Sequence, residues 1–295
     1  MATSQVKRLV VMIWAFVSMG LASVQAAPLD TPPFYKIEYK GKVSYLLGSI
    51  HVGKADFYPM AAQIESIFDS AASLAVEADA ASEDIPSLIR KYGIGQAPID
   101  AETQAILDGY CKKRLNECAA LRGYAPWLQS MQLGMARFEA LGYSAVYGVE
   151  QVLISKNRGR PLLELESTEF QFRLMASFDS DTQWSMVKEA IEGPDEDMHG
   201  LISSWRTGDE QHLAELMEGQ MSDGDDTELL EKILWQRNVD MAQRIRELML
   251  DPDTPQPMFI AVGAGHVVGE RSMVLEMQKH GARTTNCWKH QCSPR

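Results

Sequence analysis

Two segments near opposite ends of the chain share one pattern, in which an apolar run is followed by glycine, two further residues and histidine. Residues 43–51 read VSYLLGSIH, and residues 258–266 read MFIAVGAGH. Short apolar runs that end at glycine are typical of buried strands. Both runs need burial although more than 200 residues separate them. We therefore expect a sheet built from strands at both chain ends.

The N-terminal part of the chain predicts an α/β arrangement. Residues 34–39 and 43–50 flank the turn Lys40-Gly41-Lys42, which indicates a β-hairpin. A helix is expected after Pro59 and a short buried strand at residues 74–76. A strand, a helix and a second strand in this rhythm are typical of parallel pairing.

Helical patterns dominate the middle of the chain, from about residue 85 to 250, apart from a short strand at 161–165. Further helices and strands are expected over 168–192, 198–207, 210–219, 227–250, 258–262, 272–280 and 284–288. The predicted fold is α/β: a mixed, partly parallel sheet from strands at both chain ends, flanked by helices, with a large helical insertion in the middle. Residues 27–295 are expected to form a single domain.

Residues 1–26 have the features of a cleaved signal peptide. Lys7 and Arg8 precede the apolar run 9–21, and Val24-Gln25-Ala26 offers small residues to a signal peptidase. An uncleaved anchor is the alternative, but this run is shorter than the roughly 20 residues of a spanning helix. We expect a periplasmic or secreted protein without stable membrane insertion after cleavage. Its net charge of −12 argues against nucleic acid and anionic lipid as partners.

The four cysteines form two close pairs, Cys111 with Cys118 and Cys287 with Cys292. An exported chain can form disulfides, and local pairing is the simplest of the three connectivities. Seven residues of unbroken helix span about 10.5 Å, which exceeds disulfide reach. The chain must therefore turn between Cys111 and Cys118, and we expect the turn near Leu115-Asn116. A Cys₄ zinc site fits these spacings poorly.

Both histidines of the repeated pattern, His51 and His266, follow the carboxyl end of an expected strand. Ligand sites in α/β proteins collect at this edge of the sheet, and imidazole is the commonest transition-metal ligand. One Gly-x-x-His pattern is a weak signal, and either histidine alone could be a structural residue. Two such patterns at strand ends favour a shared metal site.

Carboxylates are available at the same edge. Glu77 follows the expected strand 74–76, whereas Glu164 and Glu166 flank the end of another strand and share one face. The alternatives are a helix cap for Glu77 and surface positions for Glu164 and Glu166. Two histidines with carboxylates and open positions suit a divalent metal that activates water. No nucleophile elbow, His-Glu-x-x-His helix or Walker loop competes with this interpretation.

Several motifs, in this order, resemble those of the TraB/GumN family. They are Leu47-Gly48-Ser49-Ile50-His51-Val52-Gly53, Val76-Glu77-Ala78-Asp79, Gly148-Val149-Glu150, Leu165-Glu166-Ser167 through Gln171, Arg237-Asn238 and Val262-Gly263-Ala264-Gly265-His266. The resemblance spans residues 33–288. In the first motif Ser49 stands where threonine is more usual, and the hydroxyl is kept.

The resemblance implies similarity to the TIKI metalloproteases and to the erythromycin-esterase and haem-binding-lipoprotein-like fold group. It implies a core site of His51, Glu77 and His266, with Glu150, Glu166 and Arg237 as further candidates. The metal would be manganese or cobalt, with zinc as another possibility. Two functions follow as hypotheses: a metal-dependent hydrolase of peptide or amide bonds, and a non-catalytic binder that sequesters a small peptide or other small molecule in the same cleft.

Overall fold

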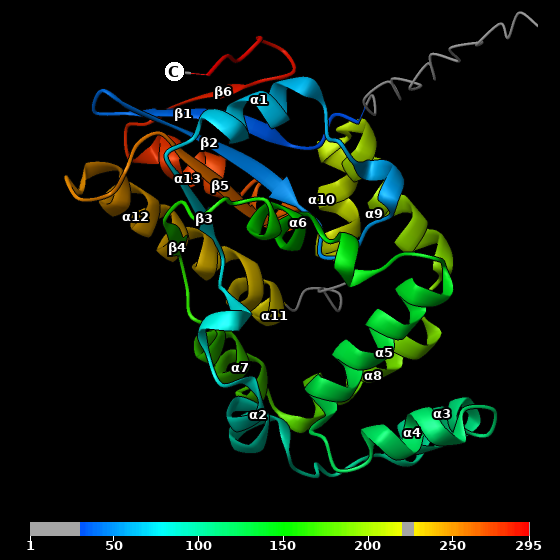
Figure 1. Ribbon diagram of the computed structural model, residues 1–295. Coiled ribbons are helices and arrows are strands. Elements are labelled where there is room, and N and C mark those ends of the chain that lie inside the picture. Colours follow the sequence, from blue (N-terminus) through cyan, green and yellow to red (C-terminus); the bar gives the residue numbers. More distant parts are fainter. Residues whose placement is uncertain (1–29, 220–226, 295) are drawn as a thin grey trace, which may run out of the picture.

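One six-stranded mixed sheet forms the centre of the larger half of the molecule (Figure 1). The computed structural model describes residues 30–219 and 227–294, so the expected signal peptide lies outside the described residues. The strands are β1 Phe34–Tyr39, β2 Lys42–Ser49, β3 Ser73–Val76, β4 Leu162–Glu164, β5 Met258–Gly263 and β6 Arg283–Asn286. Their order across the sheet is β4-β3-β5-β2-β1-β6.

Strands from the two chain ends share one sheet, as the sequence predicted. The parallel strand β5 lies between β2 and β3, while β1 pairs antiparallel with both β2 and β6. The parallel strand β4 comes from the middle of the chain and extends one edge. The carboxyl ends of β2, β3, β4 and β5 therefore meet at one edge, and the arrowhead of β2 points toward the helical region (Figure 1).

The helices divide between the two faces of the sheet and a separate helical region. They are α1 Ala62–Ser70, α2 Ile85–Leu88, α3 Ala101–Cys111, α4 Leu115–Leu121, α5 Pro126–Ala140, α6 Val149–Ser155, α7 Thr168–Ala176, α8 Ser180–Glu192, α9 Asp195–Thr207, α10 Glu210–Gly219, α11 Glu228–Leu230, α12 Gln236–Leu250 and α13 Met273–Lys279. A π-helical segment, Glu231–Trp235, joins α11 to α12.

Successive residues of β2 and β5 pack into different cores, because side chains alternate across a strand. Leu47 and Phe259 join a cluster covered by α1, α6 and α9, whose Trp205 is buried in it. Leu46 and Ile260 join a second cluster beneath α12 and α13. Parallel strands buried on both faces read as continuous apolar runs, which explains the two patterns from which the fold was predicted.

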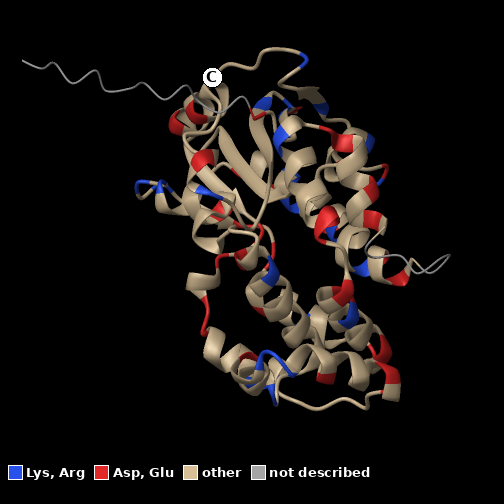
Figure 2. Cartoon of the chain, turned by 90° about the vertical axis from the view of Figure 1, so that its right-hand side faces the viewer, with Lys and Arg blue, Asp and Glu red and all other residues tan. Residues whose placement is uncertain are grey.

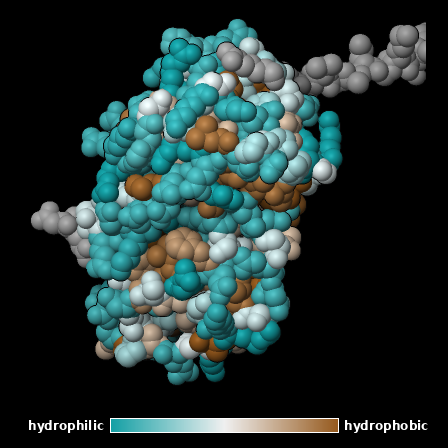
Figure 3. Space-filling view, turned by 90° about the vertical axis from the view of Figure 1, so that its left-hand side faces the viewer, coloured by the Kyte–Doolittle hydropathy of each residue, from teal (hydrophilic) through white to brown (hydrophobic). Residues whose placement is uncertain are grey.

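The helical region has a small core of its own. Leu133 of α5 packs with Trp184 and Val187 of α8, and α3 also contacts α8. This region forms the lower part of the molecule in Figure 1. Teal polar side chains dominate the face shown in Figure 3, where brown apolar side chains form several areas among them. Within the described residues, no helix has the length and apolar character to cross a membrane.

The structure confirms the α/β fold with a mixed sheet and changes several boundaries, three of them with a local cause or a clear shift. The helical stretch expected over 168–192 divides into α7 and α8, because the Asp179 side chain accepts from the Thr182 N–H and begins a new helix. The helix expected from 198 begins earlier, at Asp195. The last strand ends at Asn286, because its side chain accepts from the Trp288 N–H and turns the chain.

Both expected disulfides are present, with Cα–Cα distances of 5.7 Å for Cys111–Cys118 and 5.1 Å for Cys287–Cys292. The turn inside the first pair lies at 112–114 rather than near Leu115-Asn116, because α4 already begins at Leu115.

The two disulfides should differ in their effect on stability. Cys287 and Cys292 belong to the main core, whereas Cys111 and Cys118 join two helices at the periphery. We expect the Cys287→Ala/Cys292→Ala variant to lose about 2–4 kcal/mol of global unfolding free energy, the usual range for a native bridge. The Cys111→Ala/Cys118→Ala variant should instead show faster hydrogen exchange confined to α3 and α4. Equal global losses in denaturant unfolding would contradict this assignment.

Candidate functional site

The two glycine–histidine patterns meet at the carboxyl edge of the sheet. Ser49 of β2 pairs with Gly263 of β5, so the histidines that follow leave the sheet side by side. A Cβ atom built on Gly263 would lie 3.1 Å from Glu77 Oε1. It would also lie 3.7 Å from His266 Cδ2 and 3.9 Å from His51 Nε2. The three residues predicted as the core site thus converge, and both imidazole rings come within 4 Å of one point.

His266 is buried and its tautomer is set by Asn238. The His266 Nδ1 atom lies 2.7 Å from Asn238 Oδ1. The Asn238 amide nitrogen donates to the Arg271 carbonyl at 2.8 Å, which fixes the orientation of the amide. Nδ1 therefore carries the proton and donates it. Burial lowers the pKa of His266 to about 4 despite the nearby Glu77 carboxylate. The ring is neutral, and its Nε2 lone pair faces Glu77 Oε1 at 3.6 Å.

Glu77 is a buried, ionised carboxylate. Its Oε1 accepts from the Gly263 N–H at 2.6 Å, and its Oε2 accepts from Arg237 Nη2 at 2.8 Å. Burial opposes ionisation, but the positive charges of Arg237 and His51 and the hydrogen bond from the Gly263 N–H outweigh it and hold the pKa of Glu77 below its usual value. The Gly263 position needs glycine for this approach, because a side chain there would enter the space between the carboxylate and the rings.

Arg237 links Glu77 to Glu166. Its Nε donates to Glu166 Oε1 at 2.8 Å, and its Nη2 donates to Glu166 Oε2 at 2.8 Å. Its Nη1 donates to the Ile233 carbonyl at 2.9 Å. Such a bidentate pair fixes both side chains. Because both oxygens of Glu166 accept from Arg237, this carboxylate holds the arginine in place.

His51 lies at the solvent side of the site, with 69% of its side chain exposed. Its Nδ1 is 3.3 Å from Glu150 Oε2. The hydrogen bond to Glu150 outweighs desolvation and raises the pKa of His51 to about 9. Burial raises the pKa of Glu150 while His51 lowers it, and the net shift is upward. The pair therefore holds a proton between Nδ1 and the carboxylate.

Ser49 lies in the same buried pocket of polar atoms. Among the described residues, Ser49 Oγ and Glu150 Oε1 are buried without a partner at normal hydrogen-bond geometry. The hydroxyl is still near enough to lower the pKa of Glu150. Ser49 thus contributes to the environment of the His51–Glu150 pair.

Glu164, a candidate carboxylate of the site, instead stabilises the turn that follows β3. Its Oε1 accepts from the Asp79 N–H at 2.7 Å and from the Ser82 hydroxyl at 3.3 Å. The strand β4 ends at Glu164, so strand alternation does not place Glu166 beside it. Glu164 fastens the turn after β3, and Glu166 alone joins the site.

Two site residues were not among the predicted candidates. Asn238 orients His266, and Gln171 Nε2 lies 3.4 Å from Glu77 Oε2 and 3.3 Å from Glu166 Oε2. Asn238 follows Arg237 directly in a recognised motif, which was a usable signal. Gln171 closes the block that begins at Leu165 and resembles a family motif, so its position was a usable signal as well.

The donor atoms are not arranged as a complete set of metal ligands. Within residues 30–219 and 227–294, no group of three or more His, Cys, Asp or Glu side chains has the spacing of a metal site. The Nε2 of His266 and the Oε1 of Glu77 are 3.6 Å apart. The Nδ1 of His51 faces Glu150. The donor types nevertheless match those of a catalytic divalent metal.

The raised pKa of His51 should depend on Glu150. In the Glu150→Gln variant the anionic partner is lost, so the pKa of His51 should fall from about 9 toward its ordinary value of 6.5. Histidine titration by two-dimensional NMR of metal-free protein measures it, with the exposed His280 as an internal reference. An unchanged His51 pKa in the variant would show that the Glu150 contact does not form in solution.

Comparison with known proteins agrees with the motifs. Residues 33–286 match the TraB/PrgY/gumN family. The uncharacterized protein YbaP of Shigella flexneri is 23% identical over 249 residues, covering 78% of this chain and 86% of that protein. The uncharacterized protein YbaP of Escherichia coli K12 is 23% identical over 248 residues, covering 78% and 85%. No solved structure gives a significant match. The chain therefore belongs to the TraB/PrgY/gumN family, as its motifs predicted.

Proposed function

We propose that this protein is a divalent-metal-dependent hydrolase of peptide or amide bonds that acts in the cell envelope. The observation that carries the proposal is the contact between His266 and Glu77. The Nε2 lone pair of a neutral imidazole faces an ionised carboxylate oxygen at 3.6 Å. Two acceptors face each other there without a proton between them. A bound cation would turn this unfavourable contact into a favourable one.

The residues present fit such a cation. The three side chains surround one region beside Gly263, because a Cβ atom built there would have ring atoms of His51 and His266 and a Glu77 oxygen within 4 Å. Asn238 holds the Nδ1 proton of His266, and Glu150 accepts from the Nδ1 side of His51. Partners of this kind fix the tautomer and direct the other nitrogen toward a metal.

We assign His51, His266 and Glu77 as the ligands of manganese, cobalt or zinc. A bound divalent cation would supply Lewis-acid polarisation of the scissile carbonyl and a lower pKa for an attacking water. Arg237 and Glu166 hold Glu77 in position and keep it ionised. Because His51 is the exposed member of the set, a peptide or other small substrate would approach from its side.

The compartment is part of the proposal. The pattern of residues 1–26 supports export, and the two disulfides are of the kind that persist in oxidising compartments. Protein recovered from a periplasmic extract should have an intact mass that starts at Ala27. Recovery of the chain with residues 1–26 attached, in the membrane fraction, would contradict export as a cleaved protein.

Ligand variants test the metal-dependent activity. His266→Ala and Glu77→Gln should each weaken Mn²⁺ binding by more than the roughly 10- to 100-fold that loss of an outer partner causes, and Asn238→Ala should fall within that range. Calorimetric Mn²⁺ titration measures affinity. Mass spectrometry of a defined peptide mixture measures cleavage. His280→Ala, which removes an exposed histidine outside the site, serves as the matched control.

The sequestration hypothesis predicts another outcome for the same variants. Peptides would then bind to the wild-type protein without cleavage, with or without Mn²⁺, and His266→Ala would change neither property. Unfolding curves would show whether each variant is folded, because Glu77 and His266 are buried. Metal-independent peptide binding without turnover in folded protein would replace the hydrolase proposal.

A further inference from the structure

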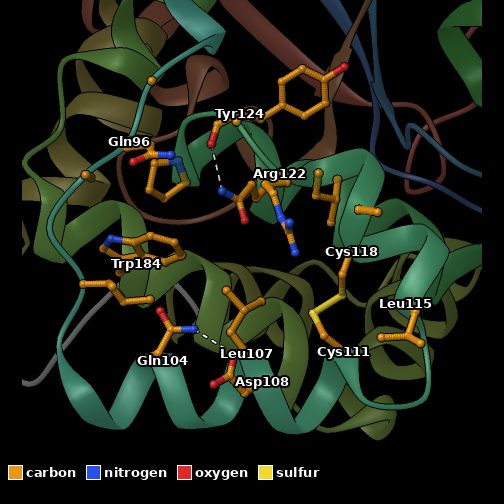
Figure 4. A pocket seen from close by; sticks show the side chains of 18 residues that line it. Gln96, Gln104, Leu107, Asp108, Cys111, Leu115, Cys118, Arg122, Tyr124 and Trp184 are labelled. Carbon is orange, nitrogen blue, oxygen red and sulfur yellow. Dashed lines mark hydrogen bonds between the residues drawn. A yellow bond between two sulfur atoms is a disulfide. The ribbon is translucent and has the colours of Figure 1, made fainter.

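A second pocket lies in the helical region and shares no residue with the His51 site. It has a volume of about 380 Å³ and lies between the α3–α4 hairpin and helices α5 and α8 (Figure 4). This volume falls within the roughly 300–1,000 Å³ that is usual for small-molecule sites.

Polar and apolar side chains share the pocket wall. The apolar side chains include Ala97, Ile99, Leu107, Leu115, Leu121 and Trp184. Leu115 is the most unusual of these, because it is 72% exposed although it is a large aliphatic residue. An apolar ligand in the pocket would cover part of this surface, and covering it is favourable.

One side chain of the lining, Arg122, is an exposed cation without a partner among the described residues. Arg122 directly follows α4, and Figure 4 shows its side chain among those that line the pocket, on the side where the disulfide joins α4 to α3. Within the described residues, its guanidinium forms no ion pair or hydrogen bond. The carboxylate in the lining, Asp108, instead accepts from Gln104 Nε2 at 2.8 Å. Arg122 therefore has donors available for an anionic group.

The chain just before Leu115 adds positive charge beside the pocket. Lys112, Lys113 and Arg114 form the tip of the α3–α4 hairpin, which Figure 2 shows in blue at the lower end of the molecule. The whole chain has a net charge of −12, and that value led us to exclude anionic lipids as partners. Net charge describes long-range repulsion, whereas this tip is locally basic.

A disulfide and a backbone hydrogen bond connect the segments that form the pocket wall, so the pocket is present without a ligand. The Cys111–Cys118 disulfide joins α3 to α4. On the other side, the Gly95 N–H donates to the Gly123 carbonyl at 3.1 Å, which ties the two loops that line the pocket. A preformed pocket lowers the entropic cost of binding.

We propose that this pocket binds a single-chain amphiphile with an anionic headgroup, such as a long-chain carboxylate. The apolar chain lies against Leu107, Leu115 and Trp184, and the headgroup accepts hydrogen bonds from Arg122. The basic tip attracts the anion and adds to its affinity. Binding here is independent of the His51 site and of any hydrolytic activity.

Dodecanoate, below its micellar concentration, is the probe. Calorimetry with the full chain should show saturable binding at one site. Arg122→Gln should weaken it about 10-fold or more, which corresponds to the loss of a charge-assisted hydrogen bond. Arg122→Lys should retain most of the affinity. Dodecanol, which has the same chain without the charge, should bind more weakly and equally to the wild-type and Arg122→Gln proteins.

Arg244→Gln is the matched control, because it removes the same charge from an exposed position on α12 outside the pocket. It should leave dodecanoate affinity within about twofold, and His51→Ala should do the same. Absence of saturable binding, or equal losses in Arg244→Gln and Arg122→Gln, would overturn the proposal. So would binding to phosphatidylglycerol vesicles without binding of monomeric dodecanoate, since that result would indicate membrane docking instead.

Discussion

The buried ion pairs of Arg237 with Glu77 and Glu166 are the interaction on which the candidate site depends. They join three elements: the end of β3, the segment after β4 and the helix α12. Removing one member of such a network leaves an uncompensated buried charge, which typically costs about 3–5 kcal/mol. The arginine thus keeps Glu77 both ionised and directed at the histidines. The next residue of α12, Asn238, sets the tautomer of His266, so two consecutive helix residues determine the state of both buried groups.

The sheet supplies the remaining geometry. Adjacent parallel strands bring both Gly-x-x-His segments to one edge, and glycine at Gly263 leaves the space that Glu77 and the rings face. Trp205 of α9 donates from its indole nitrogen to the Gly48 carbonyl at 2.8 Å, so the covering helix fixes the strand just before His51. The exposed His51 and the buried His266 lie side by side at this edge, so solvent reaches the site at His51. That arrangement suits chemistry on a small molecule that enters from the His51 side.

The sequence predicted the parts of this structure that depend on burial and on strand polarity. Continuous apolar runs identified β2 and β5 as central strands, and glycine–histidine endings identified the edge where His51, Glu77 and His266 meet. It could not predict side-chain partners that depend on rotamers. Glu164 and Glu166 looked equivalent, yet one fastens a turn and the other binds Arg237. The pairing of His51 with Glu150 and the pocket beside Arg122 arise from helix packing, which leaves no periodic signal. The net charge of the whole chain likewise gives no information about the basic tip of the α3–α4 hairpin.

The central claim is that His266 and Glu77 face each other because a cation belongs between them. An anomalous difference map from crystals grown with Mn²⁺ tests this most directly, because it locates the ion independently of any activity. We predict one strong peak within ligand distance, about 2.0–2.2 Å, of His266 Nε2 and a Glu77 oxygen, with His51 Nε2 turned toward it. A map with full Mn²⁺ exposure that has no peak there, while His266 remains singly protonated and beside Glu77, would contradict the account.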